Sequence, residues 1–394
     1  MKTTSARATM RLPLAVSHIS AGFVAVLVGY TSSVAIIFQA ASAAGATPSQ
    51  LASWMWALGI GMGTTCIGLS LYFRTPILTA WSTPGAALLV TGLDGLDMHH
   101  AIGVFLASSA LVTLAGASGG FQRLMALVPR HLAAAMLAGI LVRFGMNAFE
   151  AIALAPLLVG AMLLTWLLAR LWIPRYTVPL ALLAGVTIAA AQGLIHLHSL
   201  DWAPARPEFM TPHFSWAAFV GVALPLFIVT MTSQNVPGLA VLRANGYETP
   251  ATPLIAWTGA TGLALGPFGG FSFNLAAITA AICMSPDADP SPARRYMAAV
   301  WAGLFYLCTG IFGATVVGLF AAFPPELVAA IAGIALLGTI AGSLATAMSE
   351  DHGRDAAIVT FLCTACGVSL LGIGSAFWGL VFGMLVHHLR PRLP

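Results

Sequence analysis

Charged side chains are scarce in this sequence. Of its 394 residues, 16 are Lys or Arg and 12 are Asp or Glu, so charged residues make up 7% of the chain against 59% hydrophobic residues. A soluble globular domain carries about a quarter charged residues, so this chain is not one. The same composition excludes collagen-like, disordered and disulfide-framework proteins. Apolar stretches of about 20 residues recur along the chain and indicate a polytopic membrane protein.

Cysteines and metal-ligand patterns are also few. The five cysteines lie in apolar runs, and the pair Cys363 and Cys366 has no further ligands at zinc-site spacing. A membrane enzyme would need a nucleophile with its base, or clustered His and carboxylate ligands. Neither pattern is visible, so we expect no enzyme activity, no cofactor and no metal. Four histidines near the ends of apolar stretches are expected to have interfacial roles: His18, His99, His100 and His131.

Hydropathy divides the chain into fourteen segments at about 20 residues per span. The segments at 82–93 and 273–285 begin among Gly, Pro, Ser or Asn residues and are too short to cross about 30 Å of hydrocarbon as helices. We predict an all-α polytopic membrane protein in which segments 3 and 10 are half-helices. The expected segments are 13–40, 51–72, 82–93, 98–117, 128–147, 150–170, 177–194, 214–236, 252–267, 273–285, 295–319, 327–347, 355–372 and 374–389.

The basic residues support this threading. Lys and Arg concentrate in the cytoplasmic loops of membrane proteins. With the N-terminus inside, only Arg143 and Arg206 of the 16 basic residues fall outside. We therefore expect both termini in the cytoplasm. The sequence pI near 9.0 reflects this bias and requires no nucleic-acid partner.

Two weak internal similarities relate the halves of the chain. Residues 21–26 resemble 217–222 at an offset of 196, and residues 81–88 resemble 271–278 at an offset of 190. Because seven segments per copy is an odd number, the second copy must be inverted in the membrane, as in many transporters. The predicted repeats are 1–197, with segments 1–7, and 198–394, with segments 8–14.

The two half-helices are the best candidates for a binding site. The N-terminus of a helix has unpaired N–H groups and the positive end of a dipole, so it can hold an anion without a cationic side chain. We expect Pro84 in a first turn and Ser82 or Ser272 as a cap. The alternative is a pair of ordinary kinks packed by small residues. The candidates are Ser82, Thr83, Pro84 and Gly85 at one start, and Ser272, Phe273, Asn274 and Leu275 at the other.

Other candidates lie at the expected midplane. Hydroxyl and amide groups on segments 1 and 8 either line the site or make ordinary interhelical hydrogen bonds, and aromatic residues either contact the substrate or pack in the core. Carboxylates, the usual proton carriers, are absent from the segment interiors. Glu150 borders a segment and is the candidate for proton coupling, with an ion pair to Arg143 as the alternative. The remaining substrate-binding candidates are Tyr30, Ser32, Gln234, Asn235 and Phe271.

Together these features resemble the benzoate/proton symporter family of bacterial inner membranes, nearly from end to end. More remotely, the chain is similar to nucleobase and sulfate transporters with a seven-plus-seven inverted repeat. The resemblance implies a core domain that moves against a gate domain. The likeness is carried by residues 19–23, 81–85, 232–238 and 269–274. The implied core is about 13–117 and 214–319, and the implied gate about 120–194 and 327–389.

The resemblance implies a secondary transporter that imports an aromatic carboxylate, with benzoate as the best guess, together with protons. In the nucleobase relatives, acidic residues on segments 8 and 10 bind the substrate. The matching positions here are the amides Gln234 and Asn235 and a position near Phe271, which suit an anion. Transport of another anion or a nucleobase, and an anion channel, stay as alternatives. Expected partners are a small aromatic carboxylate, protons, membrane lipid and, by analogy with the wider fold, a second copy in a homodimer.

Overall fold

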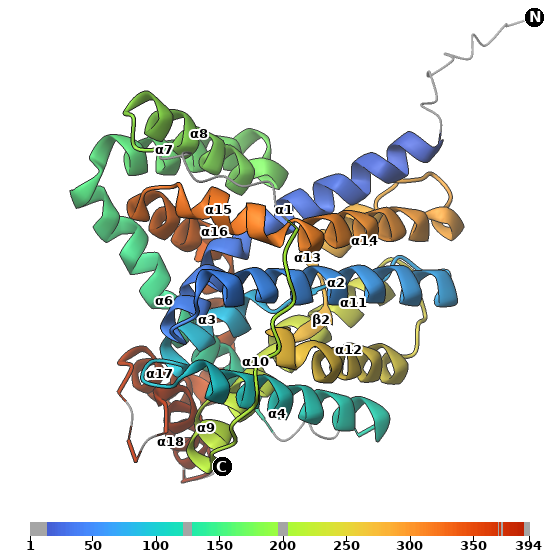
Figure 1. The fold of residues 1–394 in the computed structure, drawn as a ribbon. Coiled ribbons are helices and arrows are strands. Elements are labelled where there is room, and N and C mark those ends of the chain that lie inside the picture. Colours follow the sequence, from blue (N-terminus) through green and yellow to red (C-terminus); the bar gives the residue numbers. More distant parts are fainter. Residues whose placement is uncertain (1–13, 121–127, 196–203, 369, 372, 390–394) are drawn as a thin grey trace, which may run out of the picture.

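The computed structural model describes residues 14–120, 128–195, 204–368, 370–371 and 373–389. Helices make up most of it, and they fall at the segments that hydropathy predicts (Figure 1). The prediction of an all-α polytopic fold is confirmed, with the addition of two short strands. The helices are α1 (Leu14–Ala43), α2 (Pro48–Phe73), α3 (Thr83–Gly92), α4 (Met98–Ala117), α6 (Arg130–Leu154), α7 (Pro156–Trp172), α8 (Thr177–Ala191), α9 (Trp216–Ala218), α10 (Leu224–Thr230), α11 (Val236–Ala244), α12 (Ala251–Leu265), α13 (Ile278–Met284), α14 (Tyr296–Ile311), α15 (Gly313–Ala321), α16 (Pro325–Ala347), α17 (Arg354–Ala365) and α18 (Ser375–Leu389), and the strands are β1 (Thr79–Trp81) and β2 (Phe273–Leu275).

Several of these helices can cross a membrane unaided. Among the described residues, 6 are long and apolar enough by length and composition, and α14 with α15 would make a seventh, bent by 68°. The helices α7, α8 and α18 are apolar but shorter. The 6 long spans are Val16–Ala43, Pro48–Phe73, Met98–Ala117, Arg130–Leu154, Trp216–Ala244 and Pro325–Ala347.

The span Trp216–Ala244 is continuous but contains two π-helical turns, Phe219–Ala223 and Met231–Asn235. Each turn ends two residues before a proline, Pro225 or Pro237. A proline inside a helix has no N–H and clashes with the carbonyl four residues earlier. The wider π turn accommodates that clash. The second turn carries the Gln234 and Asn235 amides that the sequence singles out.

The half-helix α3 and the segment before α13 meet through an antiparallel ribbon. Thr79 pairs with Leu275 and Trp81 with Phe273, and the pairing extends to a hydrogen bond from Ser82 N–H to the Ser272 carbonyl at 3.1 Å. The expectation that segment 10 begins as a helix at residue 273 is wrong, because α13 begins at Ile278. A buried backbone needs hydrogen-bond partners, and for residues 273–275 strand β1 and the Asn235 side chain supply them.

The helix packing has the symmetry of an inverted repeat. Helix α2 packs on α14 as α4 packs on α12, and α7 packs on α8 as α17 packs on α18. Helix α1 contacts both α3 and α13, and the span 216–244 also contacts both. When each segment is replaced by its counterpart in the other half of the chain, seven segments away, these contacting helix pairs are converted into one another. The chain therefore forms two inverted copies that interlock.

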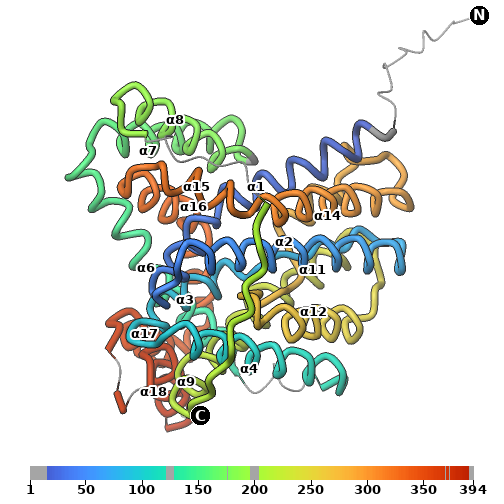
Figure 2. The backbone as a smooth tube through the Cα atoms, viewed as in Figure 1, coloured from blue at the N-terminus to red at the C-terminus, as the bar shows by residue number. Residues whose placement is uncertain are grey.

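The helices separate into a core group and a gate group. In Figures 1 and 2, α2, α4, α12 and α14 extend to the right, whereas α6, α7, α8, α17 and α18 gather on the left. Helix α16 packs along α6 and belongs to the second group. The residue boundaries of the two groups, about 13–117 with 214–319 and about 120–194 with 327–389, stay a prediction.

Glycines allow the core helices to approach closely. A methyl group on Gly59 of α2 would overlap the backbone of Gly310 on α14. One on Gly259 of α12 would overlap Thr113 of α4, at the symmetry-related contact. Small residues at such contacts let membrane helices pack by van der Waals attraction. The ribbon contacts one helix of each of these pairs, α2 and α12.

Candidate functional site

The start of α3 is capped from within, as predicted. Ser82 is fully buried and precedes the helix, and its Oγ accepts a hydrogen bond from Gly85 N–H at 2.9 Å. Pro84 lies in the first turn and has no N–H to offer. Ala86 N–H donates to the Ser82 carbonyl. The N–H of Thr83, a partly buried residue, is therefore what the start of α3 presents to a ligand.

The segment leading to α13 is buried and incompletely bonded. Ser272 has a left-handed φ of 45°, and its buried Oγ has no hydrogen-bond partner among the described residues. It is not the helix cap that the sequence suggested, because the helix begins six positions later. Asn274 Nδ2 donates to the Ser272 carbonyl at 2.8 Å, while Asn274 Oδ1 lacks a partner within the described chain. These two polar atoms are left for a ligand or water.

The start of α13 is uncapped and accessible. No side chain caps it, so the first N–H groups of the helix have no partner within it. Ile278, its first residue, is 76% exposed. The ribbon joins the two half-helices, with α3 following β1 and α13 following β2. That one substrate carboxylate lies between the two helix starts stays a prediction.

An aromatic cluster lies beside the ribbon. The Tyr30 ring packs edge-on against Trp81 at 4.8 Å and lies 6.2 Å from the Tyr306 ring. Trp81 Nε1 donates to Ser33 Oγ at 2.7 Å. Gly29 of α1 lies close to both Tyr306 and Thr279. A methyl group added at Gly29 would be 3.3 Å from the Tyr306 hydroxyl and 3.7 Å from the Thr279 methyl group. The cluster thus extends from β1 to the first turn of α13.

The two predicted amides on the span 216–244 have different surroundings. Asn235 is fully buried, accepts from Leu275 N–H at 2.9 Å and donates to the Met231 sulfur at 3.1 Å. It therefore fixes the π turn to β2. Gln234 is half-buried, and no hydrogen bond joins its amide to another described residue. Of the two, Gln234 is the one available to a ligand.

Three other candidates face away from the ribbon or are already bonded. The ring of Phe271 packs on Trp54 and Phe105, and a methyl group on Gly61 would overlap the Phe273 ring. Both phenylalanines are fully buried in core packing, which is the alternative that the sequence left open. Ser32 Oγ donates to the carbonyl of Gly29 in its own helix. The structure brings together Tyr30, Ser82, Thr83, Asn235, Ser272 and Asn274 around the ribbon.

The candidate proton carrier lies elsewhere. Glu150 is exposed near the end of α6, a helix of the gate group. Among the described ion pairs none joins it to Arg143, so the alternative of a structural pair finds no support. Its part in proton coupling stays a prediction.

Sequence reasoning missed a buried hydrogen bond between a histidine and an aspartate. His18 Nε2 lies 2.9 Å from Asp289 Oδ2, and both side chains are nearly inaccessible. Burial alone would raise the pKa of Asp289, but hydrogen bonds from Ser291 N–H and His18, with the charge of Arg294, hold that pKa below its ordinary value. The expected interfacial role of His18 stays a prediction. No spacing in the sequence relates the two residues, which are 271 positions apart.

The interlocked repeats, the paired half-helices and the core and gate groups define a membrane transporter rather than an enzyme. The sequence profile of the BenE family, described as benzoate membrane transport protein, matches residues 13–389. The chain belongs to this family of multi-pass membrane transporters.

Similar proteins agree with this assignment. The chain is 53% identical to the inner membrane protein YdcO of Escherichia coli (strain K12), over 92% of this chain and 93% of that one. It is 42% identical to the benzoate membrane transport protein of Acinetobacter baylyi (strain ATCC 33305 / BD413 / ADP1), over 98% of each. The fold matches the transmembrane domain of a cyanobacterial bicarbonate transporter, BicA, with a TM-score of 0.62 and 14% identity, covering 91% of this chain and 99% of that one.

Proposed function

We propose that this protein imports an aromatic monocarboxylate, benzoate, together with protons across the bacterial inner membrane, with both termini in the cytoplasm. Membership of the family and the 42% identical relative named a benzoate transporter support the substrate. The observation that carries the proposal is a buried ribbon with a half-helix start at each end and an aromatic cluster beside it. Backbone N–H groups hold a desolvated carboxylate there without a cationic side chain.

The carboxylate binds at the start of α13, because that start is uncapped and exposed whereas Ser82 already caps α3. The ring then lies toward Tyr30 and Trp81, which contact each other beside the ribbon. Gln234 donates an amide hydrogen to the substrate from the neighbouring π turn.

Import proceeds by movement of the core group, about 13–117 and 214–319, against the gate group, about 120–194 and 327–389. Two routes carry the proton. Either Glu150 on the gate helix α6 takes it up, or the substrate shares it, since a carboxylic acid of pKa about 4 is partly neutralised on entering an apolar site. A homodimer in the lipid bilayer is the assembly we expect from the wider fold.

Uptake of labelled benzoate into proteoliposomes tests this proposal. We expect saturable, uphill accumulation when the outside is made acidic, and inhibition by unlabelled benzoate but not by sulfate, bicarbonate or nucleobases. Uptake driven by a sodium gradient at equal pH would contradict proton coupling. Flux that neither saturates nor runs uphill would identify a channel, and competition by one of the other solutes would change the cargo.

A further inference from the structure

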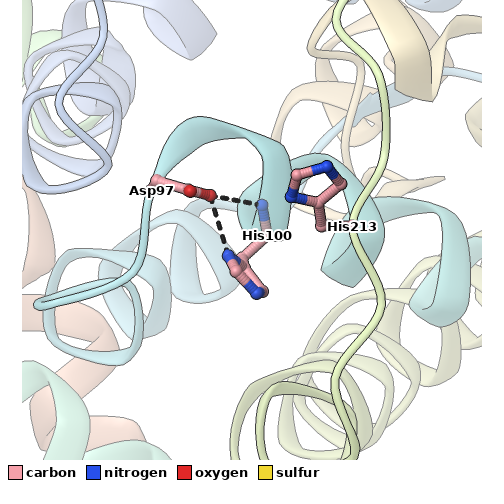
Figure 3. Close-up of side chains that lie close together, drawn as sticks. All are labelled: Asp97, His100 and His213. Atoms are coloured by element: carbon pink, nitrogen blue, oxygen red, sulfur yellow. Dashed lines mark hydrogen bonds and ion pairs between the residues drawn. The ribbon is translucent and has the colours of Figure 1, made fainter.

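A cluster of polar side chains lies away from the ribbon, where the chain enters α4. Asp97, His100 and His213 each offer a ligand atom, and these atoms all lie within 4.8 Å of one another. Figure 3 shows the three side chains converging from the start of α4 and from the extended segment that precedes α9. Asp97 and His213 are exposed and His100 is half-buried, so an ion can reach them from solvent.

The backbone fixes the positions of all three side chains. His213 N–H donates to the His99 carbonyl at 2.9 Å, and a methyl group on Gly103 would overlap the His213 carbonyl. Asp97 caps α4, with Oδ1 accepting from both the N–H and the Nδ1 of His100 at 2.9 and 2.8 Å. The segment containing His213 therefore lies directly on α4, and the cluster does not depend on a long flexible loop.

The neighbouring histidine supports this arrangement without joining it. His99 Nδ1 is bonded to Thr211, at 2.8 Å from its carbonyl and 3.0 Å from its hydroxyl. The His99 ring lies 4.9 Å from the His213 ring. These contacts hold His213 against α4 and orient its ring toward His100, 5.7 Å away between centroids.

We propose that Asp97, His100 and His213 form a binding site for Zn²⁺, with a water molecule as the fourth ligand. Imidazole nitrogens and a carboxylate oxygen are ligands that Zn²⁺ prefers, at about 2.0 to 2.2 Å in tetrahedral geometry, and three protein ligands leave one position open. Small side-chain rotations bring the three atoms to that spacing. When the metal takes the Nδ1 position, the neutral His100 ring carries its one proton on Nε2. Protons compete with the metal for both imidazoles, so binding weakens as the pH falls. The bound ion joins the segment before the span 216–244 to α4.

Isothermal titration of purified, chelator-treated protein with Zn²⁺ tests the site, using a tag without histidine. We expect one ion per chain, and a higher melting temperature with Zn²⁺ than without. The double variant H100A/H213A should weaken binding at least a hundredfold and lose the thermal shift, since even residues behind the ligands typically contribute about 10- to 100-fold. Asp97→Asn keeps the helix cap but removes the charged ligand, and should weaken binding about tenfold or more.

The chain offers a matched control. His387 and His388 are adjacent exposed histidines on α18, so the variant H387A/H388A removes as many imidazoles and should bind one Zn²⁺ as the wild type does. Elution volume and metal-free melting temperature establish that each variant is folded. The proposal is overturned if wild type binds no Zn²⁺ at 100 µM, roughly the weak end of useful metal affinity, or if H100A/H213A binds it like the wild type. Both results are independent of the transport substrate.

Discussion

His18 Nε2 and Asp289 Oδ2, 2.9 Å apart, join the start of α1 to the loop between α13 and α14. The same loop is held by Arg295, whose guanidinium donates to the carbonyls of Asp289 and Met284. The pair therefore connects α1, the first segment of the first repeat, to the loop that follows the half-helix α13 of the second repeat. We expect it to contribute to stability, because it lies outside the ribbon and its aromatic cluster.

Removing the charge of Asp289 should destabilise the protein. In Asp289→Asn the buried His18 and the nearby Arg294 lose their anionic partner, and we expect a loss of about 1 to 3 kcal/mol of stability. Thermal unfolding in detergent measures it. Asp287→Asn, a change at an exposed acid two residues earlier, is the control and should leave the melting temperature unchanged. Equal melting temperatures for both variants would contradict the role of the pair.

The stability of the protein should fall in acid because of the same group. The pKa of Asp289 is lower in the folded protein than its ordinary value, so its stabilising contribution is present above the ordinary value of about 3.9 and is lost as the pH falls through the folded value. Melting temperatures measured from pH 7 down to pH 3 should drop less steeply for Asp289→Asn than for wild type. Parallel curves would show that other groups dominate acid unfolding.

The hydrogen bond from Trp81 to Ser33 should orient the aromatic cluster for substrate. Trp81→Phe keeps a ring but removes the Nε1 donor at 2.7 Å, and losing one hydrogen bond costs about 0.5 to 1.5 kcal/mol. That energy corresponds to a rise of roughly three- to tenfold in the KM for benzoate. We expect the variant protein to insert into the membrane normally. Ser33→Ala should have a similar effect, and the double variant should add little because both changes remove one interaction. Additive effects would indicate separate roles.

Gln234 should contact the anion through its amide. Gln234→Leu removes a hydrogen-bond donor, whereas Gln234→Glu adds a charge that repels the carboxylate. Benzoate uptake should therefore be lower in Gln234→Glu than in Gln234→Leu, by roughly tenfold for about 1.4 kcal/mol of repulsion. Asn245→Asp, at an exposed amide beyond the end of α11, controls for the added charge. Equal uptake in the Glu and Leu variants would place Gln234 outside the site.

Hydropathy and local chemistry predicted much of this fold. Long apolar runs locate the helices because every backbone group in lipid must be bonded within its own segment, and the serine and proline at residues 82 and 84 specify the start of α3 through local hydrogen bonding alone. The strand at 273–275 could not be predicted in this way. Its partner, β1, lies about 190 residues earlier, and only the folded chain brings the two together.

The sequence also could not predict the directions in which these side chains point. Phe271 and Phe273 stand next to Ser272, but strand geometry sends their rings into the packing of α2, α4 and α12. In the proposed site, Tyr30 of α1 and Trp81 of β1, whose rings contact each other, take the aromatic role instead. The pairing of His18 with Asp289 also depends on a tertiary contact that carries no local signal.

Ser272 should show a conflict between stability and transport. Its φ of 45° is unfavourable for a residue with a Cβ, and its buried Oγ has no partner among the described residues. Ser272→Gly removes both costs, since glycine adopts positive φ readily, and we expect a gain of about 1 kcal/mol in stability. If the hydroxyl binds the substrate, the same change should lower benzoate affinity.

Melting temperature and benzoate uptake are measured on the same preparation. The control is Ser285→Gly, at a partly buried serine after α13. A stabilised variant that transports normally would show that Ser272 is a strained structural residue and not part of the site.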